Sequence, residues 1–188
     1  NKIIDSDILG LDTFTIKNLE IFNSLSGLEK GTLINVIDKT TTFMGSRLLK
    51  SWIKRPLNSV SEIMARQNKV TDYYNNNSLR NDTIDILKQV SDIDRIVARL
   101  SANKSNPRDV INLLISLKTV DQLKKITPKK LSQLKKLLMK SNDLGGICSK
   151  IEMTIRSNCA ANFNQAGYIK EGFSKELDSL REISSNVN

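Results

Sequence analysis

The chain has 188 residues, with 29 lysines and arginines against 20 aspartates and glutamates, and a formal net charge of +9 at pH 7. It contains no histidine, so the commonest general base and the usual nitrogen ligand of metals are both absent. No apolar run approaches the roughly 20 residues that span a bilayer, and no segment has the pattern of a signal peptide. We therefore expect no membrane segment.

The first clear helical pattern lies between Leu33 and Pro56. A short apolar run at 33–37 is followed by three threonines at 40–42, whose hydroxyls favour helix caps over helix interiors. Pro56 should stop the next helix, because the residue before a proline disfavours the helical region. The apolar residues of that helix recur at spacings of three and four: Met44, Leu48, Leu49, Trp52 and Ile53. Taken by itself, this pattern is typical of an ordinary core-facing helix.

Further helices follow, and most have a recognisable start. Ser59 and Glu62 have the spacing of a capping box, which predicts a helix ending near residues 75–77. The next helix covers residues 79–90, and Ser91 opens a shorter one through residue 100.

Two further starts combine a capping residue with a proline in the first turn. Asn106–Pro107 begins a long helix that reaches residue 123, and Thr127–Pro128 repeats the device for a helix through residue 138. Gly145–Gly146 should break the chain after it. We predict an all-α fold, an elongated multi-helix bundle, in which residues 19–22 are the single candidate for a minor short strand.

The basic excess is concentrated between residues 118 and 140, where eight lysines accompany one aspartate. One interpretation is a face that contacts a DNA backbone, since clustered lysines release counterions without reading sequence. The other is a solvated face beside a leucine stripe, which we favour because no aromatic residue interleaves with the lysines. The candidate phosphate contacts are Lys124, Lys125, Lys129, Lys130, Lys135 and Lys136.

Catalysis has little support in the sequence. Without histidine no Ser-His or Cys-His pair can form, and no Gly-x-x-x-x-Gly-Lys-Ser/Thr loop is present to hold nucleotide phosphates. We expect no catalytic, cofactor-binding or metal-binding residue in this chain. Cys148 and Cys159 are best explained as buried free thiols in a reducing compartment, whether cytoplasm, nucleus or mitochondrion.

The segment GTLINVIDKT (31–40) followed by MGSRLLKSWIKRPL (44–57) resembles the core of the MutS family of DNA mismatch repair ATPases. Further matches run in family order along nearly the whole chain. They are Leu11–Asp12, Thr15, 18–21, Ile63, Arg66, 92–95, 98–100, 106–109, Gly167, 169–173, 176–178 and 181–182.

The resemblance implies a core (lever) domain over residues 1–166 and the start of the ascent into a DNA clamp over 167–188. In such proteins a separate N-terminal domain binds the mismatch and a separate C-terminal domain hydrolyses ATP with Mg. Neither the family's Phe-x-Glu motif nor its Walker loop occurs here. ATP and Mg are therefore expected only in a parent protein, which would bind double-stranded DNA as a homo- or heterodimer. We expect the chain to be an excised domain.

Residues expected to pack the lever are Leu48, Leu49, Trp52 and Ile53, with Arg47 and Arg95 as polar anchors between helices. In the family the chain returns from the clamp to complete the lever. We therefore expect part of the apolar stripe of the last helix (Leu177, Leu180 and Ile183) to be uncovered here and to be buried by a second copy or by crystal contacts. An alternative function stays open, a free-standing basic helical module that binds nucleic acid or a partner helix.

Overall fold

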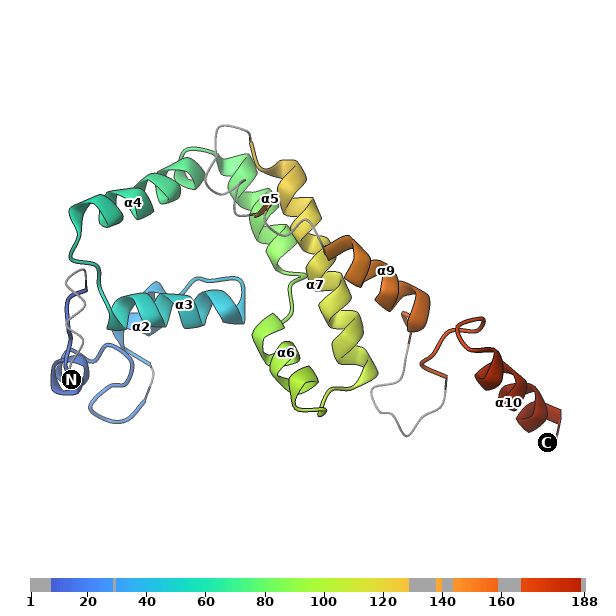
Figure 1. The fold of residues 1–188 in the computed structure, drawn as a ribbon. Coiled ribbons are helices and arrows are strands. Elements are labelled where there is room, and N and C mark those ends of the chain that lie inside the picture. Colours follow the sequence, from blue (N-terminus) through green and yellow to red (C-terminus); the bar gives the residue numbers. More distant parts are fainter. Residues whose placement is uncertain (1–7, 29, 129–137, 140–143, 159–166, 187–188) are drawn as a thin grey trace. The chain divides into compact units, whose positions relative to one another are not determined.

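Most of the described helices begin after a residue whose side chain caps the first turn. The computed structural model describes residues 8–28, 30–128, 138–139, 144–158 and 167–186. Within these ranges the fold is all-α, with several helices and no sheet, which confirms the predicted class (Figure 1). The chain divides into two compact units, residues 1–88 and 89–188. The boundary that we predicted near residue 166 falls outside the described residues and stays a prediction.

The described part of unit 1 contains five helices: α1 (Thr13–Asn18), α2 (Leu33–Ile37), α3 (Phe43–Lys54), α4 (Val60–Tyr74) and α5 (Asn77–Leu87). The described helices of unit 2 are α6 (Ile93–Ser101), α7 (Pro107–Ile126), α9 (Leu144–Thr154) and α10 (Lys175–Asn186). None of the helices in the described ranges is both long and apolar enough to cross a membrane.

Residues 19–22 do not form the short strand that we considered, because they end α1 instead. Glu20 adopts a left-handed conformation with φ of 47°. The N–H of Ile21 then donates to the carbonyl of Ile16, and that of Glu20 to the carbonyl of Lys17, which is the Schellman arrangement at a helix end. The carbonyls of Glu20 and Ile21 accept the N–H groups of Leu33 and Ile34, so this turn also supports the start of α2.

The buried core of each unit is small. Ile21, Ile34 and Leu79 are the buried hydrophobic residues among those described in unit 1, and Ile96, Ile111 and Leu114 are those of unit 2. Helix α7 also buries hydroxyls, which donate to the carbonyl four residues earlier: Ser116 to Asn112, Thr119 to Ile115 and Thr127 to Leu123. These bonds satisfy polar groups that would otherwise be costly to bury.

Several predicted boundaries agree with the structure. Thr42 caps α3, whose last residue is Lys54, and α4 ends at Tyr74, just before residues 75–77. Asn106 and Pro107 open α7 as expected.

Other predicted starts are wrong in detail. Ser59 precedes α4 but makes no side-chain cap, because its hydroxyl pairs with that of Ser61. Asp92, rather than Ser91, caps α6, and α5 ends at Leu87 instead of reaching residue 90.

The predicted break at Gly145–Gly146 is also wrong, since both glycines lie in the first turn of α9. Each glycine costs a helix only about 1 kcal/mol relative to alanine, so the pair does not by itself exclude a helix. Thr127 ends α7, whereas the helix that we predicted to begin there lies mostly outside the described residues.

Candidate functional site: polar joints between helices

The short connection between α2 and α3 is held by Asp38, the residue that follows α2. One oxygen of its carboxylate accepts from the Thr40 N–H (3.0 Å) and the Thr40 hydroxyl (2.6 Å). The other accepts from the Ser46 hydroxyl at 2.5 Å, inside the first turn of α3. The Asp38 side chain therefore fixes the end of α2 relative to the start of α3. We call such a polar contact between two helices a joint.

These bonds favour the ionised form of Asp38. Hydrogen bonds from Ser46, then from Thr40, lower the pKa of this carboxyl below its ordinary value, and the charge of Lys50 adds to the effect. The joint is therefore fully formed at neutral pH.

Gly45 lies in the first turn of α3, where little space is left for a side chain. Its N–H donates to the hydroxyl of the capping residue Thr42 at 3.0 Å. A Cβ at position 45 would lie 3.0 Å from that hydroxyl oxygen and 3.4 Å from the Cβ of Thr40. A larger residue would push against the hydroxyl that caps the helix, which gives the Met-Gly-Ser segment of the sequence a physical reason.

The strongest joint in unit 2 connects α6 to α7. Arg99 Nε donates to Asp109 Oδ2 at 2.9 Å, and its terminal nitrogen to Oδ1 at 2.5 Å. Asp109 is 6% exposed, and it also completes a capping box with Asn106 at the start of α7. The two nearly parallel bonds form the bidentate pair that a guanidinium favours.

The ion pair shifts the pKa values of both side chains in the directions that favour their charged forms. The Arg99 hydrogen bond, reinforced by the Asn106 N–H and the Arg99 charge, lowers the pKa of Asp109, while burial opposes the shift. The Asp109 hydrogen bond raises the pKa of Arg99. Asn103 at φ 53° closes the C-terminal turn of α6, so that a bond from Lys104 N–H to Arg99 carbonyl also ties the turn to this residue.

A second contact links the segment before α6 to the middle of α7. The N–H of Ser91 donates to the hydroxyl of Ser116 at 3.0 Å, and Ser116 is buried.

Further along, Lys118 of α7 pairs with Glu152 of α9. Beside it, burial raises the pKa of the Cys148 thiol, with the charges of Asp121 and Glu152 acting in the same direction. Cys148 is a free thiol, but it is half-buried rather than buried as we expected, and Cys159 lies outside the described residues.

The base of α10 has its own polar contacts. Arg181 donates to the carbonyl of Ile169 at 2.9 Å and pairs with Asp178 at 3.0 Å. Asp178 also accepts the N–H of Gly172, which has the positive φ of 80° that favours glycine. Several of the family-like residues in 167–182 therefore shape this one turn.

The candidate packing residues lie on α3. Leu49 and Ile53 are half-buried, while Leu48, Trp52 and Arg47 are exposed. The ring of Trp52 is covered on one side by the guanidinium of Arg66 from α4, 4.0 Å from the ring centroid. This contact ties α3 to α4.

Of the two candidate polar anchors, Arg47 is exposed on α3, and the ion pair described for Arg95 is a local one. Arg95 makes an ion pair at 3.4 Å with Asp92, three residues earlier, and its side chain is 74% exposed. Arg99, one turn later, makes the pair between helices. Two features of the sequence could have identified Arg99. It lies in the family-like segment Ala98–Leu100, and an acidic residue, Asp109, completes the capping box that begins at Asn106.

The eight lysines between residues 118 and 140, which we call the lysine cluster, are only partly described. Lys124 pairs with Asp121 at 3.2 Å, and Lys125 is exposed on α7. Lys129, Lys130, Lys135 and Lys136 lie outside the described residues, so the predicted phosphate-binding face stays a prediction. In the described ranges no group of three or more aspartate, glutamate or cysteine side chains could hold a metal ion.

Taken together, capped helices connected by ionised joints define an all-α helical module. The family model described as MutS domain III matches residues 14–188. The chain therefore belongs to the MutS domain III family, and the resemblance stated above is confirmed.

Similar curated proteins carry the name DNA mismatch repair protein MutS. That of Persephonella marina is 36% identical over 179 residues, covering 95% of this chain and 20% of that protein. That of Chlorobium chlorochromatii is 34% identical over 184 residues (97% and 21%). That of Clostridium botulinum strain 657 is 37% identical over 182 residues (96% and 20%). The chain thus spans about a fifth of the length of these relatives.

Proposed function

We propose that the chain is a non-catalytic core (lever) module of a MutS-like DNA mismatch repair protein. In this role it couples a DNA clamp to an ATPase domain outside the chain, where ATP and Mg would bind. The family membership of residues 14–188 is the observation that carries the proposal. The name shared by the relatives supports the mismatch repair context.

The polar joints supply a physical means of coupling. A helical module transmits a displacement when its helices move as units between discrete arrangements, and such coupling is a free energy shared between two sites. The Arg99–Asp109 pair holds the end of α6 to the start of α7, and the Asp38 bonds hold α2 to α3. Each joint would pass the motion of one helix to the next.

The coupling role can be tested in the longer protein that carries this chain. Asp109→Asn weakens the joint without touching the proposed ATP or DNA sites. We expect ATP hydrolysis without DNA to be retained, while the stimulation by mismatched duplex falls severalfold. Arg95→Gln is the matched control, because its ion pair lies within one helix. Equal stimulation in the wild type and Asp109→Asn would contradict the role of this joint.

The isolated chain separates the coupling module from the free-standing alternative. Fluorescence anisotropy with matched and mismatched duplexes should give weak, salt-sensitive binding that does not distinguish the two. Tight binding by the chain alone would favour a free-standing nucleic-acid-binding module.

A further inference from the structure

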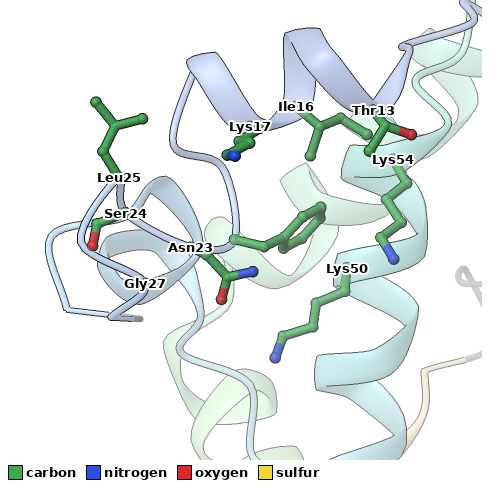
Figure 2. A pocket seen from close by; sticks show the side chains of 10 residues that line it. Thr13, Ile16, Lys17, Asn23, Ser24, Leu25, Gly27, Lys50 and Lys54 are labelled. Atoms are coloured by element: carbon green, nitrogen blue, oxygen red, sulfur yellow. The ribbon is translucent and has the colours of Figure 1, made fainter.

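A pocket of about 1070 Å³ lies in unit 1 between α1, the loop after it, and α3. Three lysines line it: Lys17 from α1, and Lys50 and Lys54 from α3. Figure 2 shows Lys50 and Lys54 extending from the same side of α3, with the loop that carries Asn23, Ser24 and Gly27 opposite. We call this site the lysine pocket.

The electrostatics of the lysine pocket favour an anion. None of the ten described lining residues is acidic. Lys50 and Lys54 are one helical turn apart, a spacing at which like charges repel, and an anion between them would relieve that repulsion. Lys50 also acts on Asp38, so the argument rests chiefly on Lys17 and Lys54.

The rest of the lining is part apolar and part hydrogen-bonding. Ile16, Phe22 and Leu25 contribute apolar surface, and the Nζ of Lys54 lies 5.2 Å from the centroid of the Phe22 ring. The side chains of Thr13, Asn23 and Ser24 add donors and acceptors. A pocket of this volume suits a ligand with an anionic end and a flat apolar or aromatic end.

We propose that the lysine pocket binds a phosphate-bearing ligand of nucleotide size, with the phosphate among the three lysines and the base against Phe22. Lysine binds phosphate as a point charge, and every cation among the described lining residues is a lysine. The ligand is a free nucleotide or one nucleotide of a single strand, since a stacked duplex does not present a base to a concave site.

The test is titration of the ¹⁵N-labelled chain with thymidine monophosphate and, separately, with a thymidine hexanucleotide. We expect saturable shifts of the amides of Asn23, Ser24 and Gly27 with at least one probe. A hexanucleotide that binds tenfold more tightly assigns the site to single strands, and equal affinities assign it to free nucleotides.

Variants decide whether the lysines cause the binding. Lys17→Gln/Lys54→Gln should weaken it at least tenfold and reduce the salt slope for the hexanucleotide by about 1.4. Lys54→Arg keeps the charge and should keep most of the binding, which guards against a folding defect. Lys39→Gln/Lys104→Gln removes the same charge from exposed sites outside the pocket and should leave the amide shifts intact. Equal losses in both double variants, or no shift with either probe, would overturn the proposal.

Discussion

The carboxylate of Asp38 is the centre of a small hydrogen-bond network in unit 1. Three hydrogen bonds from Thr40 and Ser46 converge on its carboxylate. The sequence places these residues close together, but it does not say which hydroxyl turns toward the aspartate and which caps a helix. In the structure Thr42 takes the capping role and Thr40 the pairing role.

The lowered pKa of Asp38 predicts a pH dependence. The folded state keeps this carboxyl ionised where the unfolded chain, with a pKa near 3.8, begins to bind a proton. The stabilisation is therefore complete above about pH 4 and is lost as pH falls through the lowered folded-state pKa. Asp38→Asn should lower Tm by about 3 °C at pH 7, and the difference from the wild type should shrink below pH 4.

Thermal melts between pH 7 and pH 2.5 measure this effect. Asp72→Asn, at an exposed position on α4, is the control and should leave the pH profile unchanged. A gap between the wild type and Asp38→Asn that widens on acidification would refute the assignment.

At the scale of single helices, the two arginines of α6 give a matched comparison. Arg99→Ala leaves the carboxylate of Asp109, 9% exposed in its side chain, without its bidentate partner. We expect Tm to fall by about 4 °C after allowance for solvent screening, since the Arg99 side chain is 42% exposed.

Arg95→Ala removes an i,i+3 ion pair whose arginine is 74% exposed, and it leaves the cap from Asp92 to the N–H of residue 95 in place. Its effect on Tm should stay below about 1 °C. Differential scanning calorimetry of both variants is the measurement, and equal Tm losses would mean that the pair between α6 and α7 contributes no more than a surface pair.

The lysine cluster is tested at the scale of the whole chain. Two of its described members are paired, Lys118 with Glu152 and Lys124 with Asp121, which fits the solvated face that we favour. Neutralising Lys129, Lys130, Lys135 and Lys136 to glutamine should therefore leave the salt dependence of duplex binding nearly unchanged. A slope reduced by about 3.6 would instead establish a phosphate-binding face.

The apolar stripe of α10 predicts self-association. Leu180 and Ile183 are 63% and 61% exposed, and apolar side chains that share one face of a helix commonly mark an interface. Sedimentation velocity at high concentration should show dimers, which Leu180→Asp/Ile183→Asp abolishes. Ser179→Asp adds charge on the same helix beside the stripe and serves as the control. A wild type that stays monomeric at millimolar concentration would rule out this interface.

The sequence by itself determined the family, the all-α class and many of the helix boundaries. Capping residues such as Thr42 and Asn106 act on their nearest neighbours, so their effects are local and visible in sequence. Only the tertiary structure decided that Arg99 rather than Arg95 joins two helices, and that three lysines line one pocket. Those facts depend on which residues, distant along the chain, folding brings together, and local spacing carries no information about that choice.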